Sequence, residues 1–94
     1  MSNTKYNLEE ETDVLDATRF KLVLWNDDVN TFDWVIQTLC EVCKLEEVQA
    51  EQCSLIIHNR GKCAVKSGEY ETLKPMCSSI TDRGISATIE EMVH

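Results

Sequence analysis

The sequence has little glycine, little proline and few basic residues. Its 94 residues include three glycines and one proline, and nine lysines and arginines stand against 17 aspartates and glutamates. The glycines form no glycine-rich loop of the kind that cradles phosphates. A net charge of -8 disfavours nucleic acid and anionic membrane as partners, because both attract lysine and arginine. A cationic ligand or a basic protein surface fits this charge.

Long apolar runs are also missing. No stretch approaches the roughly 20 apolar residues that span a bilayer, and the first residues lack the order of a secretory signal peptide. We therefore expect a cytoplasmic protein. The length and a hydrophobic content of 43% predict one small domain with a single core. Residues 1–18, rich in acidic side chains, are expected to form a flexible extension, and residues 19–94 the core domain.

Hydrophobic alternation predicts the first and last strands. Phe20, Leu22 and Leu24 alternate with the residues between them, and residues 85–90 alternate in the same way. A short strand is also expected over residues 62–66, before a Ser-Gly turn. These segments predict a three-stranded sheet.

Two helices are expected between the first two strands. One begins at Phe32 after a cap at Asn30 or Thr31, because both residue types bond the free amides of a first turn. The other covers residues 46–58 and is ended by Gly61.

A third helix is expected before the last strand. It should begin near Thr72, because Pro75 is tolerated only in the first turn of a helix, and end at residues 82–84. The element order β-α-α-β-α-β predicts an α+β fold in which three helices pack on a three-stranded antiparallel sheet.

Two carboxylates and an amide follow the first strand, at Asn26, Asp27 and Asp28. Asn and Asp are also ordinary turn residues, which bond backbone amides two positions further on. Two adjacent carboxylates repel each other, and an arriving cation relieves that repulsion. His58, at the end of an apolar run, is either a hydrogen-bonded boundary residue or a partner of this turn. The pattern favours recognition of a cationic group over catalysis.

The five cysteines leave a second interpretation open. Cys40 and Cys43 form a Cys-x-x-Cys pair, which would suggest a small zinc or redox module if further ligands joined it, from Cys53, His58 and Cys63. Both thiols of the pair fall on the apolar face of the first helix, so free thiols packed as small hydrophobes are the simpler expectation. No metal or other cofactor is expected. An enzyme that used a thiol beside His58 would need an oxyanion hole, and nothing in the sequence marks one.

Several motifs together resemble those of the ClpS family, the adaptors that deliver N-end-rule substrates to Clp AAA+ proteases. They are LWNDD at residues 24–28, a phenylalanine at the first helix start, a histidine at 58 followed by Gly-Lys at 61–62, and ATIE at 87–90. The resemblance covers about residues 19–92. It implies a fold of three strands and three helices and an adaptor without enzymatic activity. It also implies two partners: substrates that begin with Leu, Phe, Tyr or Trp, and the N-terminal domain of a Clp unfoldase. We expect a monomer.

The resemblance further implies roles for individual residues. Contacts to the substrate α-amino group fall to Asn26, Asp28 and His58, with Asp27 supporting the turn. The side-chain pocket would be lined by Asn30, Phe32, Val35, Ser54, Ile57 and Ile85, and the unfoldase would dock near Glu71 and Lys74. Two positions depart from the family pattern, because Phe32 stands where the family usually has a methionine gate and Ser54 where it usually has an apolar residue.

Overall fold

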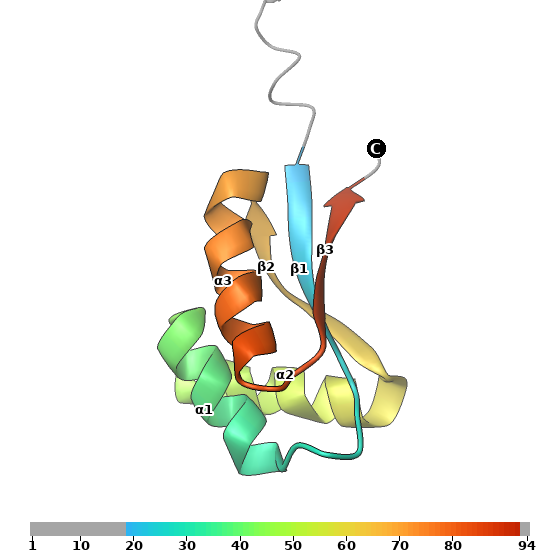
Figure 1. Ribbon diagram of the computed structural model, residues 1–94. Coiled ribbons are helices and arrows are strands. Elements are labelled where there is room, and N and C mark those ends of the chain that lie inside the picture. The colour runs from blue at the N-terminus through green and yellow to red at the C-terminus, as the bar shows by residue number, and fades with distance from the viewer. Residues whose placement is uncertain (1–18, 93–94) are drawn as a thin grey trace, which may run out of the picture.

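The structure is a computed structural model that describes residues 19–92, and it contains three strands and three helices (Figure 1). The predicted extension over residues 1–18 lies outside the described residues. The elements follow the predicted β-α-α-β-α-β order, which confirms the α+β fold class. They are β1 (Arg19–Trp25), α1 (Phe32–Val42), α2 (Glu47–Arg60), β2 (Lys62–Gly68), α3 (Tyr70–Asp82) and β3 (Ala87–Met92).

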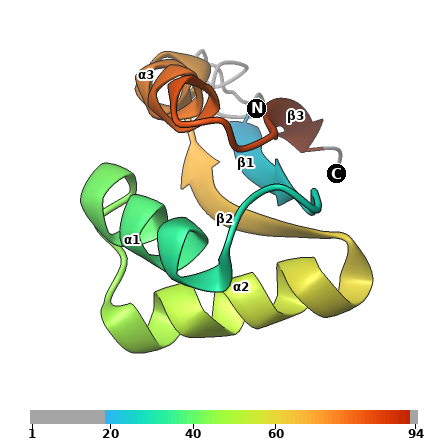
Figure 2. The same cartoon turned by 60° about the horizontal axis from the view of Figure 1, so that its bottom comes forward.

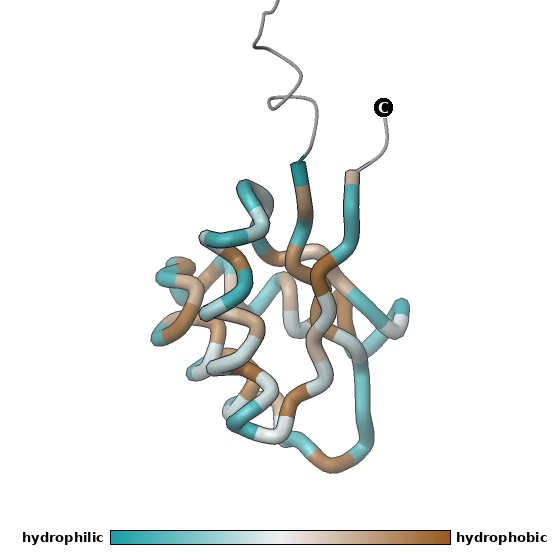
Figure 3. The backbone as a smooth tube through the Cα atoms, turned by 45° about the horizontal axis from the view of Figure 1, so that its top comes forward, coloured by the Kyte–Doolittle hydropathy of each residue, from teal (hydrophilic) through white to brown (hydrophobic). Residues whose placement is uncertain are grey.

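The sheet has the order β2-β1-β3, and β1 pairs antiparallel with both neighbours. The central strand carries the most deeply buried residues of the sheet, Leu22, Val23 and Leu24. Figure 3 shows the predicted alternation as teal and brown segments at the outer end of β1. Since β1 is paired on both edges, its exit is held at a fixed place, and the Asn26 turn begins there.

Two helices lie at one end of this sheet and the third lies along it. Figure 1 shows α3 running along the sheet, with α1 and α2 at the end where β1 leaves it, and Figure 2 shows α1 and α2 side by side. The core between them is made by fully or nearly fully buried side chains, among them Leu39, Ala50, Ile57, Leu73 and Ile80. The start of α1 and the end of α2 are thereby brought next to the exit of β1.

Local signals fix these two helix ends. Thr31, one of the two predicted caps, accepts a hydrogen bond from the Trp34 backbone at 3.1 Å. Gly61 ends α2 in the left-handed conformation at a φ of 95°, which glycine adopts without a steric penalty. Its carbonyl then accepts the Asn26 backbone N–H at 2.8 Å. This bond ties the end of α2, where His58 lies, to the turn after β1.

The third helix differs from its prediction. It begins at Tyr70 rather than near Thr72, so Pro75 lies inside the helix and not in its first turn. Pro75 is exposed, so water can reach the carbonyl four residues earlier that the missing N–H leaves unbonded. Burial of Leu73 and Ile80 against the core holds the helix across this gap. Smaller differences are that β2 continues to Gly68 and that β3 begins at Ala87, after Ile85.

We expect Pro75→Ala to stabilise the protein. A proline inside a helix costs about 3 kcal/mol relative to alanine, and the flexibility gained by the unfolded chain removes about 0.4–1 kcal/mol of that benefit. The free energy of unfolding should therefore rise by about 2–2.6 kcal/mol in urea titrations. Ser79→Ala, at another exposed position of α3, is the matched control and should change it by less than about 0.5 kcal/mol. An unchanged or lower stability of the Pro75 variant would contradict the free-energy cost assigned to a proline inside this helix.

None of the three helices in residues 19–92 combines the length and the hydropathy of a membrane-crossing segment.

Candidate functional site

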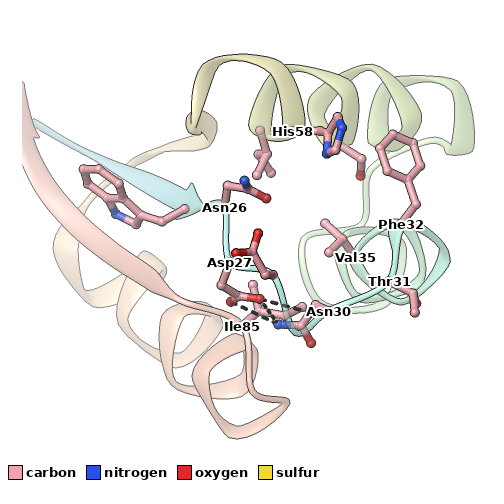
Figure 4. Close-up of a pocket in the computed structure, with 12 residues that line it drawn as sticks. Asn26, Asp27, Asn30, Thr31, Phe32, Val35, His58 and Ile85 are labelled. Carbon is pink, nitrogen blue, oxygen red and sulfur yellow. Dashed lines mark hydrogen bonds between the residues drawn. The ribbon is translucent and has the colours of Figure 1, made fainter.

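A cavity of about 330 Å³ opens where the exit of β1, the start of α1 and the end of α2 meet (Figure 4). Every residue that sequence reasoning assigned to the amine contacts or to the side-chain pocket lines it. The lining also includes Trp25 and Thr31, which were not predicted. This volume lies at the lower end of the range of small-ligand pockets, about 300–1,000 Å³, so it suits a ligand group of the size of one amino-acid residue.

Asp27 organises the turn that forms one wall. Its carboxylate accepts the backbone N–H groups of Val29 and Asn30, each at 3.1 Å, and the side-chain amide of Asn30 at 2.8 Å. Burial raises the pKa of this carboxyl, but hydrogen bonds from Asn30, Val29 and the Ser86 backbone outweigh it, so the pKa of Asp27 lies below its ordinary value. An ionised, fully engaged Asp27 supports the turn instead of pointing a vacant acceptor at a ligand.

Asn30 connects this turn to the other side of the pocket. Its amide donates to both Asp27 oxygens and to the Gly84 carbonyl, the last at 2.8 Å. Gly84 directly precedes Ile85, so the bond holds the turn against the loop between α3 and β3. The Asn30 amide therefore lines the pocket as a brace between two segments that lie 54 residues apart in sequence.

Three polar side chains of the lining keep vacant hydrogen-bonding capacity. Within residues 19–92, neither a side-chain hydrogen bond nor an ion pair engages Asn26, Asp28 or His58, and all three are exposed. Figure 4 shows Asn26 on the turn after β1 and His58 on the neighbouring helix α2. A carboxylate, an amide oxygen and a ring nitrogen can each accept a hydrogen bond, so the cavity can receive a group with several N–H donors.

Apolar side chains from three segments supply further walls of the pocket. Ile57 and Ile85 are 5% and 3% exposed, Val35 is half-buried, and together they supply branched aliphatic walls from α2, the loop before β3 and α1. Phe32 stands at the rim, 40% exposed, with its ring centroid 6.3 Å from that of His58 in an edge-to-face arrangement. Ser54 lies in the same wall as Ile57 and is 3% exposed. The cavity thus combines hydrogen-bond acceptors with apolar walls.

Trp25 and Thr31 were missed because each has a structural role with a weak sequence signal. Trp25 ends β1, donates its indole N–H to the Thr88 hydroxyl at 2.9 Å and carries the Lys62 ammonium 4.9 Å from its ring centroid. Thr31 caps α1. Their positions next to the Asn-Asp-Asp turn and to Phe32 were the signal that could have identified them.

The predicted docking residues lie elsewhere. Glu71 and Lys74 are exposed in the first half of α3 and contribute nothing to the pocket lining. Their role in binding an unfoldase stays a prediction.

The zinc or redox interpretation gains no support from the described residues. In residues 19–92, no group of three or more His, Cys, Asp or Glu side chains is placed to hold a metal ion. Cys43 and Cys53 are buried, and all five thiols are free. Burial raises the pKa of the Cys43 and Cys77 thiols, and burial together with the neighbouring Cys63 raises the pKa of Cys53 to about 11. A redox thiol needs the opposite shift, because the thiolate is the reactive form.

Comparisons with known proteins agree with this architecture. The family model of the ATP-dependent Clp protease adaptor protein ClpS matches residues 16–88. The ATP-dependent Clp protease adapter protein ClpS of Synechococcus sp. (strain CC9902) is 33% identical over 75 residues, which cover 79% of this chain and 72% of that protein. A part of the E3 ubiquitin-protein ligase UBR1 of Drosophila melanogaster is 32% identical over 74 residues, which cover 79% of this chain and 4% of the ligase.

A solved structure shares the fold. Agrobacterium tumefaciens ClpS2 bound to L-phenylalaninamide matches with a TM-score of 0.77 and 22% sequence identity, over 81% of this chain and 99% of that chain.

Proposed function

Because the chain belongs to the ClpS family of Clp protease adaptors, we propose that it binds proteins through their free N-terminal residue and delivers them to a Clp AAA+ unfoldase. The observation that carries the proposal is one cavity that combines vacant acceptors with apolar walls. Vacant acceptors at Asn26, Asp28 and His58 adjoin the apolar walls of Ile57 and Ile85 in a space of about 330 Å³. A bulky hydrophobic N-terminal residue, Leu, Phe, Tyr or Trp, has the matching halves.

The vacant acceptors of the pocket suit an α-amino group. With a pKa near about 8, this group is cationic at neutral pH and presents three N–H donors. Asp28 supplies a charge-assisted acceptor, and Asn26 and His58 supply two neutral ones. An internal residue of a substrate lacks the cationic amine, so it could contact only the apolar walls of the pocket.

The apolar walls of the pocket suit the side chain of the substrate's first residue. Burying a Leu or Phe side chain contributes about 1.5–3 kcal/mol, and Val35, Ile57 and Ile85 offer the surface for it. Agrobacterium tumefaciens ClpS2, which shares the fold, has been solved with L-phenylalaninamide, a molecule that combines a free amine with a benzyl side chain. We extend that mode of binding to this chain on the strength of its own pocket lining.

Delivery requires a second surface. We propose that Glu71 and Lys74 on α3 contribute to docking on the unfoldase N-terminal domain, because both are exposed and lie away from the pocket. We further propose that residues 1–18 act as an extension offered to the unfoldase. The protein itself has no catalytic part in this scheme, since the chemistry of degradation belongs to the protease.

A peptide panel tests the binding step. Fluorescent peptides that differ only in the first residue, Phe, Leu or Ala, are titrated with the full chain and followed by anisotropy. The Ala-first peptide should bind at least about 10-fold more weakly, because it forgoes about 1.5–3 kcal/mol of side-chain burial. Equal affinity for Phe and Ala at the first position would refute the proposed side-chain pocket.

A further inference from the structure

The wall of the pocket contains a buried hydroxyl with no partner. Ser54 is 3% exposed, and its Oγ is the one buried side-chain polar atom in the described part of the chain that makes no hydrogen bond. Most buried hydroxyls are paired, because an unpaired one costs about 1–3 kcal/mol. A helical serine commonly bonds the carbonyl one turn earlier, and Ser54 does not do so here.

Ser54 is placed near His58, one of the proposed contacts to the substrate amine. Ser54 and His58 are four residues apart on α2, so they lie on the same face with a rise of about 6 Å between them. That separation is comparable to the length of an aromatic side chain measured from its backbone. A substrate whose amine lies beside His58, and whose first side chain runs along α2 toward Ser54, has the tip of that side chain at the level of Ser54. Rotation about χ1 between staggered positions can turn the serine hydroxyl toward that tip.

We propose that Ser54 is a specificity-determining residue that makes the pocket favour tyrosine over phenylalanine at the substrate N-terminus. This inference rests on the proposed function and adds the substrate preference within it. The tyrosine phenol both donates and accepts a hydrogen bond, and so does the serine hydroxyl, so either orientation of the pair satisfies both groups. Phenylalanine has the same ring and leaves the Ser54 hydroxyl unpaired.

The preference follows from the cost of burying the tyrosine phenol or the Ser54 hydroxyl without a hydrogen bond. The phenol must leave water to enter the pocket, and in a fully apolar pocket this loss would favour phenylalanine. A partner at Ser54 reverses the order, because a hydrogen bond contributes about as much as a two- to tenfold change in affinity. Leucine fills the aliphatic walls of Val35, Ile57 and Ile85 and gains nothing from the serine.

The test compares Tyr-first and Phe-first peptides on the wild-type chain and on two variants of Ser54. Tyr-first and Phe-first peptides with identical remaining residues are titrated with the wild-type chain and with Ser54→Ala, each beside its N-acetylated form. The wild-type chain should bind the Tyr-first peptide about 5-fold more tightly than the Phe-first peptide. In Ser54→Ala this ratio should fall to one or below, through weaker binding of the Tyr-first peptide with little change for Phe. Ser54→Cys, with the same side-chain geometry but a larger sulfur atom and a weak S–H donor, should give an intermediate ratio.

The possible outcomes distinguish the role of Ser54 in specificity from the proposed adaptor function. Tighter binding of the Phe-first peptide by the wild-type chain, or the same Tyr-to-Phe ratio in wild type and Ser54→Ala, would overturn the role of Ser54 while leaving the adaptor function intact. Failure of both peptides to bind more tightly than their acetylated forms would overturn the proposed function, and the specificity with it. Thermal melting checks the variant fold: removing an unpaired buried hydroxyl should leave the melting temperature unchanged or higher.

Discussion

Asp28→Ala is expected to weaken the binding of a Phe-first peptide by about 10- to 100-fold while leaving the stability of the domain unchanged. A hydrogen bond to a charged group contributes about 1.5–3 kcal/mol, and the proposed pair joins a carboxylate to a cationic amine. The Asp28 side chain is exposed and engaged by no other side chain in residues 19–92, so its removal breaks nothing within the fold. Anisotropy titration measures the affinity, and urea titration measures the free energy of unfolding.

Acetylating the peptide amine provides the second arm of this experiment. If Asp28 acts through the amine charge, the acetylated peptide should bind weakly to wild type and variant alike, and the two changes should not add. Asp82→Ala, which removes another exposed carboxylate outside the pocket, is the matched control and should leave peptide affinity unchanged. A full loss of affinity in both Asp82→Ala and Asp28→Ala would show a general effect of net charge and count against a local contact.

The positions of the pocket residues were predictable because local signals mark the ends of the elements that carry them. Strand alternation ends at Trp25, the cap before Phe32 starts α1, and Gly61 ends α2 just after His58. The cavity opens where the exit of β1, the start of α1 and the end of α2 lie next to one another. The motif resemblance supplied the expected roles of these residues, which stay predictions, and the pattern of residues alone left the turn open to a purely structural interpretation.

The partners of these residues were not predictable in the same way. Asn30 was expected as pocket lining, and its bond to the Gly84 carbonyl joins segments that no short-range pattern relates. The unpaired state of the Ser54 hydroxyl likewise depends on what surrounds it in three dimensions. The start of α3 was misplaced because the proline rule was weighed without the burial of Leu73 and Ile80, which outweighs one missing hydrogen bond. Long-range packing decided each of these cases.

Asp27→Ala, at the neighbouring carboxylate, is expected to act on the fold and on binding together. It removes the acceptor of two backbone N–H groups and of the Asn30 amide, so the free energy of unfolding should fall by about 2–3 kcal/mol. Peptide affinity should fall as well, because the turn that positions Asp28 loses its brace. Asp28→Ala is the matched control for stability, since it removes an adjacent carboxylate that holds no turn.

The stability difference between wild type and Asp27→Ala should also depend on pH. Hydrogen bonds place the folded-state pKa of Asp27 below its ordinary value, which is about 3.9 in an unfolded chain. A lowered carboxyl pKa contributes stability that is fully present above the unfolded-state pKa and is lost as pH falls through the folded-state pKa. Urea titrations at pH 7 and pH 3 should therefore show a smaller difference at pH 3. A difference that stayed constant or grew on acidification would mean that the turn is held by the shape of the side chain and not by its charge, and the separation of a supporting Asp27 from a ligand-binding Asp28 would lose its physical basis.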